Sequence, residues 1–136
     1  MTGENLRTSV HRADFEVLEK LRSSSHMSVG VVHAATNVAD PVLYGALGWG
    51  WGSQNGCLWH NAFLSGKEFG GDSAWDGQEG WGKDDVLGLE VDFSAGTLTA
   101  FKNGEKLGKI ADGLSGELRW AVSLERQGEC VSVTRV

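Results

Sequence analysis

The sequence predicts an all-β fold in which two antiparallel sheets form one β-sandwich, and three observations support this. Apolar and polar residues alternate in several short segments, as they do in strands that bury one face. Turn sequences separate these segments at short intervals. The chain of 136 residues also holds 20 glycines and 1 proline, a composition that favours many tight turns over long helices.

The amino-terminal residues 1–14 are polar, and we expect a flexible segment or part of a first strand there. The β-sandwich domain is expected to cover residues 15–136. Its first segment, Phe15 to Arg22, is ambiguous. Apolar residues recur at helical spacing after Asp14, a good helix cap, whereas Phe15 and Val17 also fit the start of a strand. Ser28 to His33 is short and rich in β-branched residues, which predicts a strand.

Aromatic residues and glycines are densest between Tyr44 and Trp59. Gln54-Asn55-Gly56 is a hairpin turn sequence, so we expect two short strands around it. The chain holds 6 tryptophans, most of which must lie in the core because a soluble domain exposes few large apolar groups. We expect Trp75 and Trp81 to be half-buried, since they lie in a polar segment.

That segment, Ser65 to Asp85, is rich in glycine, and its six acidic residues and two lysines leave a net charge of −4. Such a composition is typical of a solvated loop. The alternative is a recognition loop.

The last third of the chain has the clearest strand patterns. Val86 to Phe93 alternates with period two, which predicts a strand with one buried face. Thr97 to Lys102 predicts the next strand, and Asn103-Gly104 after it is the strongest short hairpin signal. Three further strands are expected at Lys106 to Ile110, at Arg119 to Leu124 with Trp120, Val122 and Leu124 on one face, and at Cys130 to Thr134.

The net charge is −6 and the pI about 5.1. This disfavours binding to nucleic acid and to anionic lipid, so we expect a protein or peptide partner, alone or within a larger complex, and neither nucleic acid nor membrane. The sequence shows no secretory signal. Cys57 and Cys130 are therefore expected to be reduced and packed as small hydrophobes, in the cytoplasm or nucleus.

Few residues suggest catalysis. Glu90 and Asp92 share one strand face, as do paired carboxylates in some glycosidases, but strand alternation alone explains both. Cys57 and His60 lack a second pair at zinc-site spacing. Neither a nucleophile motif nor a phosphate-binding loop is present. The sequence therefore predicts a protein that is not an enzyme and needs no metal or cofactor.

Several blocks, in order, resemble the SPRY domain family. They are Phe15-Glu16-Val17, residues 28–32 (SVGVV), residues 48–51 and 55–61 (GWGW and NGCLWHN), residues 84–92 (DDVLGLEVD), residues 96–104 (GTLTAFKNG) with Leu107-Gly108, and residues 120–124 (WAVSL). Single blocks are weak, whereas their shared order from Phe15 to Val133 is specific.

The resemblance implies a bent two-sheet antiparallel β-sandwich of the concanavalin-like jelly-roll type, with Phe15 to Arg22 as a strand. It also implies a non-catalytic protein-interaction module that binds peptides with loops at one edge. Three features depart from the family pattern: a short amino-terminal segment, Trp120-Ala121 without the usual proline, and Arg126 or Gln127 where members linked to ubiquitin ligases carry an aromatic. We therefore do not expect the resemblance to extend to ligase recruitment.

Transferred to this chain, the resemblance implies a loop-edge site of Thr36, Asn37, Tyr44, Arg126 and Gln127. Tyr44 is the expected anchor, Arg126 would pair with a carboxylate or stack on an aromatic, and Asn37 and Gln127 would bond a peptide backbone. The alternative is a core Tyr44 and a merely solvated Arg126. The alternative function is a carbohydrate-binding sandwich that uses exposed tryptophans, and the weakest is a glycoside hydrolase that uses Glu90 and Asp92.

Overall fold

The computed structural model describes residues 10–22, 25–33, 48–60 and 74–136, and these form strands without any helix. The strands are β1 (Val10–Glu19), β2 (Ser28–His33), β3 (Gly48–Gly52), β4 (Leu58–His60), β5 (Val86–Asp92), β6 (Thr97–Lys102), β7 (Glu105–Ala111), β8 (Leu118–Ser123) and β9 (Cys130–Arg135). In this part of the chain no helix is long and apolar enough to cross a membrane.

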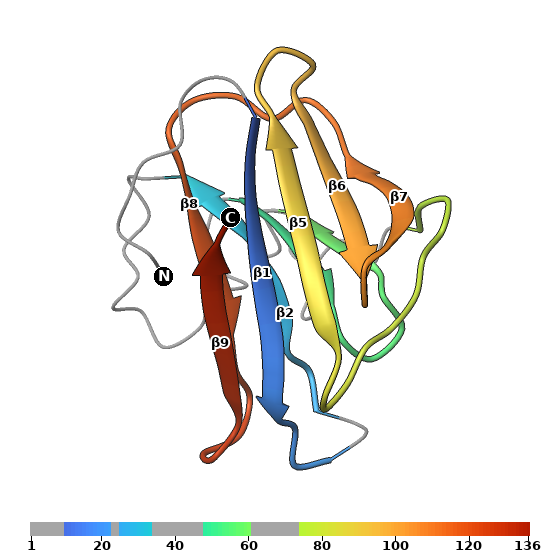
Figure 1. Ribbon diagram of the computed structural model, residues 1–136, viewed down its shortest axis with the longest axis vertical. Helices are drawn as coiled ribbons and strands as arrows, with labels where there is room; N and C mark the ends of the chain where they lie inside the picture. The colour runs from blue at the N-terminus through green and yellow to red at the C-terminus, as the bar shows by residue number, and fades with distance from the viewer. Residues whose placement is uncertain (1–9, 23–24, 34–47, 61–73) are drawn as a thin grey trace.

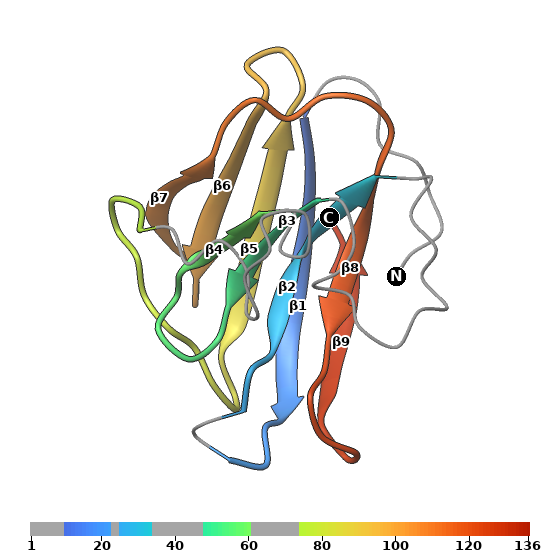
Figure 2. The same ribbon diagram turned by 180° about the vertical axis from the view of Figure 1, so that it is seen from behind.

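The strands form two antiparallel sheets that pack face to face. The five-stranded sheet, in the order β7-β6-β5-β1-β9, faces the viewer in Figure 1, and the four-stranded sheet, in the order β4-β3-β2-β8, faces the viewer in Figure 2. This arrangement confirms the predicted all-β sandwich. Successive strands change sheet at β1–β2, β4–β5, β7–β8 and β8–β9. The β1–β2 and β8–β9 connections close the same end of the sandwich, at the bottom of Figure 1.

The ambiguous first segment is a strand from Phe15 to Glu19, as the resemblance implied, whereas residues 20–22 lie beyond the end of β1. Ala13, Phe15 and Val17 of β1 are fully buried, because β1 lies between β5 and β9 and turns every second side chain inward. The pairing of β1 with β5 on one side and β9 on the other satisfies the backbone hydrogen-bonding groups that a helix would satisfy internally. Tertiary contacts therefore override the local helical pattern. The strand begins at Val10, within the residues expected to be flexible or part of a first strand.

The β6–β7 hairpin turns at Asn103-Gly104, as predicted. Asn103 has φ 52° and Gly104 has φ 86°, and positive φ at both central residues defines a type I′ turn. Lys102 pairs with Glu105 across the two-residue loop. Farther along, the β6–β7 register shifts twice, between Leu98 and Thr99 and between Ala100 and Phe101.

The core lies between the sheets, where Phe15 of β1 meets Trp120 of β8. Their ring centroids are 6.0 Å apart at an interplanar angle of 75°, an edge-to-face packing that aromatic pairs favour. Trp51 is also fully buried, and Trp49 nearly so. On the opposite face of the four-stranded sheet Gly30 pairs with Gly50, so the alternation of glycine and tryptophan places large rings on one face only.

Three burial predictions were wrong. Trp81 is 4% exposed rather than half-buried, because its backbone N–H bonds the carbonyl of Ser53 and places it beside β3. Leu124 is 45% exposed, because β8 ends at Ser123 and the chain turns away before the alternation can bury it. Cys57 is buried as expected, whereas Cys130 is exposed at the start of the edge strand β9, and the two cysteines are not joined by a disulfide.

Candidate interaction surface

Two of the five predicted site residues, Arg126 and Gln127, lie in the β8–β9 loop. Thr36, Asn37 and Tyr44 lie outside the described residues. The strand register places the attachment points of the two groups apart. β2 ends at His33 beside Leu118, whereas the β8–β9 loop starts after Ser123, beside Ser28. These ends are separated by roughly 17 Å, five steps of about 3.4 Å.

A buried carboxylate, Glu129, organises the β8–β9 loop. Glu129 is 6% exposed, and its Oε1 accepts hydrogen bonds from the backbone N–H groups of Glu125 (3.1 Å) and Arg126 (2.8 Å). Its Oε2 accepts the N–H of Leu21 (3.2 Å) from the β1–β2 connection. One side chain thus fixes the loop and joins the two crossings that close this end of the sandwich.

Charges around Glu129 reinforce this junction. Glu125 Oε2 accepts the backbone N–H of His26, which is a second link between the loop and the β1–β2 connection. Burial by itself raises the pKa of Glu129, but the N–H groups of Arg126, Leu21 and Glu125 stabilise the anion, and the pKa lies below its usual range. Burial lowers the pKa of the nearby Lys20, while Glu129 and Glu125 act in the opposite direction.

We expect Glu129→Gln to destabilise the domain by about 1–3 kcal/mol at pH 7, the scale of a lost charge-assisted hydrogen-bond acceptor. A carboxylate with a lowered folded-state pKa contributes stability above its unfolded pKa, near 4.3, and loses it as pH falls through the folded value. Urea unfolding of both proteins at stepwise lower pH should therefore show the difference shrinking below about pH 4. The exposed Glu105→Gln is the matched control, and a pH-independent difference for Glu129→Gln would contradict this role.

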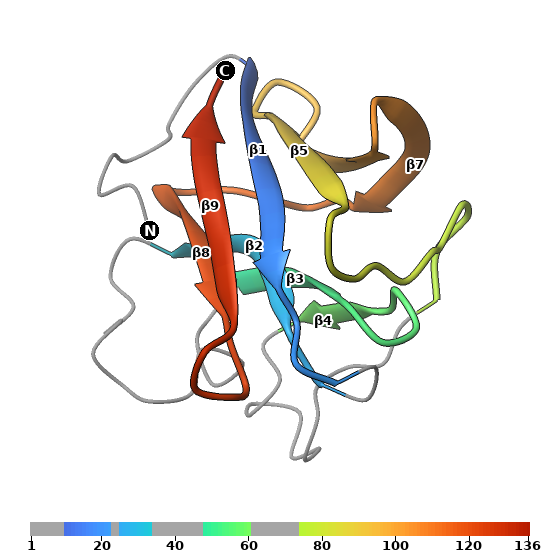
Figure 3. The same ribbon diagram turned by 60° about the horizontal axis from the view of Figure 1, so that its bottom comes forward.

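Exposed apolar and cationic residues lie in the two connections that Glu129 joins. Leu21 is 50% exposed and Leu124 is 45% exposed, and Gly128, without a side chain, faces the end of Leu21. Exposed Arg22 and Gln127 and half-exposed Arg126 complete the set. We call these five residues, Leu21, Arg22, Leu124, Arg126 and Gln127, the loop-end surface; Figure 3 brings this end of the sandwich forward.

The backbone of Arg126 is held by hydrogen bonds, but its guanidinium group makes only weak contacts. Its backbone is fixed twice, since its N–H bonds Glu129 and its carbonyl accepts the N–H of Glu129 at 3.1 Å. Its guanidinium reaches Glu125 Oε1 only at 4.0 Å. Its Nε is buried and has no hydrogen-bond partner among the described residues. A buried donor without an acceptor is unfavourable, so the guanidinium can gain from an added acceptor.

Sequence reasoning missed Leu21 and Glu129. Leu21 belonged to the segment whose helical or strand character was open, and no sequence pattern drew attention to Glu129. The separation of Leu21 and Glu129 in sequence is 108 positions, so no local pattern signals their contact. The one available signal was that residues 125–129, which follow a predicted strand, are mostly polar. This composition predicts a loop but not the hydrogen bonds within it.

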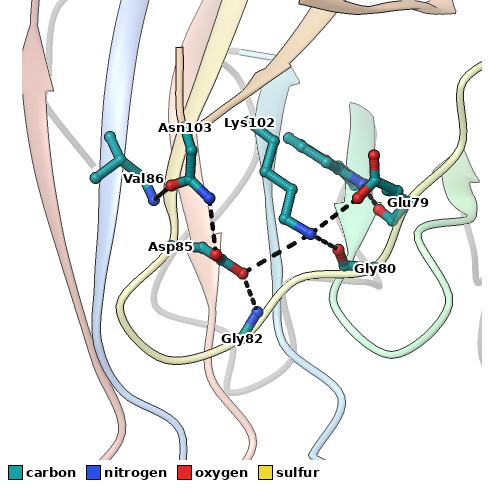
Figure 4. A network of polar contacts seen from close by, with 8 residues as sticks. Glu79, Gly80, Gly82, Asp85, Val86, Lys102 and Asn103 are labelled. Atoms are coloured by element: carbon teal, nitrogen blue, oxygen red, sulfur yellow. Dashed lines mark hydrogen bonds and ion pairs between the residues drawn. The ribbon is translucent and has the colours of Figure 1, made fainter. Parts of the chain in front are cut away.

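The acidic segment is fastened to the sandwich in its described part, residues 74–85. Lys102 at the end of β6 donates to Glu79 Oε1 (3.1 Å) and to the carbonyl of Gly80 (2.9 Å), and lies 4.0 Å from Asp85 Oδ2 (Figure 4). Asp85 also accepts the N–H of Gly82 (2.8 Å) and the side-chain amide of Asn103 (3.0 Å). These acids hold the segment against the β6–β7 hairpin, which accounts for them without a ligand.

The remaining chemical candidates gain no support. Asp92 Oδ1 accepts the N–H groups of Ser94 and Ala95, at 2.9 and 3.2 Å, and so caps the β5–β6 turn. Glu90 lies on the same outer face, opposite the buried Leu89 and Val91. Within the described ranges no group of three His, Cys, Asp or Glu side chains is arranged to hold a metal ion.

A carbohydrate site was expected to use exposed tryptophans, and among the tryptophans whose burial the structure describes only Trp75 is not buried. Trp49, Trp51, Trp81 and Trp120 are buried, and half-buried Trp75 bonds the carbonyl of Gly56 at 2.6 Å. A groove of 620 Å³ runs beside Trp75 along Leu107 to Asp112. Two of its exposed charges, Lys109 and Asp112, pair with each other at 3.2 Å.

The fold and the loop-end surface define a class of protein: an antiparallel β-sandwich that presents ordered loops on a rigid scaffold. The comparisons with known proteins place the chain within that class. The family model described as the SPRY domain matches residues 12–135. The match covers most of the chain, which therefore belongs to the SPRY domain family, whose members are generally non-enzymatic protein-interaction modules.

Solved structures agree on the fold. The SPRY domain of human HERC1 superposes with a TM-score of 0.75 at 18% identity, covering 96% of this chain and 77% of that chain. A second human SPRY domain gives a TM-score of 0.61 at 14% identity, covering 96% and 81%. A putative glycosyl hydrolase from Parabacteroides distasonis reaches only 0.47 at 12% identity, covering 96% and 70%, which supports no argument about activity. No curated protein sequence matches the chain.

Proposed function

We propose that this domain binds a partner protein through the loop-end surface. The observation that carries the proposal is that exposed Leu21 and Leu124 and half-exposed Arg126 lie on two connections that the buried carboxylate of Glu129 joins at one end of the sandwich. Exposed apolar side chains that gather in one place mark interaction sites on soluble proteins. A fixed loop loses little conformational entropy on binding, and arginine is among the residues enriched at binding hot spots.

The proposal keeps the residues predicted from the sequence. Gln127 is exposed beside Arg126 and can bond a partner backbone. Thr36, Asn37 and Tyr44 are proposed to extend the same surface from the connection between β2 and β3, with Tyr44 as a second anchor. If they do, Tyr44→Ala and Arg126→Ala should weaken the same complex, and their effects should be coupled, as in a double-mutant cycle of neighbouring residues.

We expect Leu21→Ser and Arg126→Ala each to weaken binding to a purified partner by about 2 kcal/mol, roughly thirtyfold. Both should change the free energy of unfolding by less than about 1 kcal/mol, because the side chains are at least partly exposed. The partner is identified by photo-crosslinking from position 127, and affinities are then measured by titration calorimetry. Lys106→Ala on β7 is the control. Unchanged affinity for both variants would show that the loop-end surface is not the binding site.

A further inference from the structure

We infer that Glu129 is the positioning residue of the loop-end surface, and that it makes the β1–β2 connection and the β8–β9 loop open and close as one cooperative unit. Glu129 is 6% exposed, so it acts on a partner through the residues that it holds, above all Leu21 and Arg126. This inference rests on the proposed function, because it states how the two sides of that surface are held ready for a partner.

The hydrogen bonds of Glu129 are divided between two segments that are distant in the sequence. Its Oε1 accepts the backbone N–H groups of Glu125 (3.1 Å) and Arg126 (2.8 Å), and its Oε2 accepts that of Leu21 (3.2 Å), 108 positions away. We call these three N–H groups the junction amides. All of them lie outside the strands, so sheet pairing does not hold them, and their order depends on one carboxylate.

The acceptors of the junction all lie on one side of it, which makes its opening cooperative. Glu129 and Glu125, whose Oε2 accepts the N–H of His26, both belong to the β8–β9 loop. If this loop moves away, the β1–β2 connection therefore loses both links at once. If the connection moves away instead, Glu129 keeps a buried oxygen without its N–H partner, which is unfavourable for a charged group. Neither side opens without cost to the other.

Cooperative opening affects binding because Leu21 and Arg126 belong to opposite sides of the junction. A partner that contacts both residues binds the closed unit and not the open one. Its apparent dissociation constant is then the intrinsic constant divided by the fraction of molecules in which the unit is closed. Glu129 thus controls the affinity of a surface to which it contributes almost no exposed area.

Native-state hydrogen exchange, followed by NMR at rising urea concentrations, tests the coupling in the free domain. The three junction amides are expected to share one opening free energy and one urea dependence, although they come from two segments. Both quantities should be smaller than those of the Leu89 and Ala100 amides, which belong to inner strands and exchange with unfolding of the whole domain. Junction amides that exchange only with these core amides would show that Glu129 has a purely structural role.

Glu129→Gln decides whether the two sides depend on each other. A glutamine side chain has one acceptor oxygen and one NH₂ group, so it can serve only one of the two sides. In a cooperative unit all three junction amides lose protection together, by about ten- to hundredfold, the effect of lost hydrogen bonds to a charged group. Glu129→Asp keeps both acceptor oxygens and should retain part of this protection. Glu105→Gln, exposed on β7, makes the same change in charge and should leave the junction amides unchanged.

The outcomes separate this inference from the proposed function. If Leu21 exchanges independently of the loop amides, or if Glu129→Gln affects one side only, the coupling is wrong and the loop-end surface still stands as a binding site. If the junction amides behave as one unit but no partner crosslinks from position 127, the proposed function is wrong and the coupling stands. With the crosslinked partner, the affinity of Glu129→Gln should fall by the factor by which exchange shows the closed fraction to fall. A larger loss of affinity would contradict an indirect role of Glu129.

Discussion

Replacing Gly30 by alanine is expected to lower the free energy of unfolding by about 3 kcal/mol, the upper range for overpacking a well-packed site. A Cβ at this position would overlap the carbonyl oxygen of Trp49 and lie 2.8 Å from the Cα of Gly50. Both obstacles are backbone atoms of β3, so no side chain can move aside. The pairing of β2 with β3 would have to open, which also disturbs the packing of Trp49 and Trp51.

Gly82→Ala is the matched control for this experiment. A Cβ there meets only the Lys20 side chain at 4.0 Å, so the same methyl group should change stability by less than about 1 kcal/mol. Urea unfolding monitored by tryptophan fluorescence measures both variants. Equal stability of Gly30→Ala and wild type would contradict the close approach of β2 and β3.

Phe15→Ala is expected to destabilise the domain by about 3–5 kcal/mol, the usual range for removing a buried phenyl ring. Phe15 is fully buried on β1, an inner strand of the five-stranded sheet, and packs edge-to-face on Trp120 of the opposite sheet. Its removal opens a cavity between the sheets rather than at their margin. Since a domain of this size is stable by about 5–15 kcal/mol, this single change removes a large fraction of that stability.

Phe93→Ala tests whether position or ring size controls the effect. Phe93 follows the end of β5, is only partly buried, and packs on His11 with ring centroids 6.2 Å apart. Its loss should cost about 1–2 kcal/mol, because less apolar area is involved. Similar losses for Phe15→Ala and Phe93→Ala in thermal and urea unfolding would show that Phe15 does not bridge the two sheets.

The strands could be predicted where the local sequence pattern and the pairing within the sheet favour the same secondary structure. Ser28 to His33 and Thr97 to Lys102 form strands with the predicted bounds. Asn103-Gly104 makes its turn because the required dihedrals depend on these two residues alone. Phe15 to Arg22 shows the limit of this reasoning: its helical spacing is real, but the neighbours β5 and β9 decide its structure.

The candidate site was less predictable, because its order comes from distant contacts. Arg126 was identified through the family resemblance, but the role of Glu129 depends on Leu21, which the chain brings close only after both sheets have formed. The acidic segment shows the same effect. Its charges suggested a solvated loop, yet Lys102 from another strand draws Glu79 and Asp85 into one network. The composition of a segment gives its net charge, but it does not show which oppositely charged side chains of other segments lie near it.

The irregular β6–β7 pairing has a consequence for solubility. β7 is an outer strand of its sheet, and such strands can template the growth of aggregates through their free backbone groups. Here two register shifts distort the strand, and exposed Lys106 and Lys109 add charge to it. The turn at Asp76-Gly77 presses against Leu107 and Gly108 so closely that a Cβ on Gly77 would overlap the Leu107 carbonyl oxygen. A strand from another molecule would therefore meet a bent, charged and partly covered border, which disfavours edge-to-edge pairing at β7.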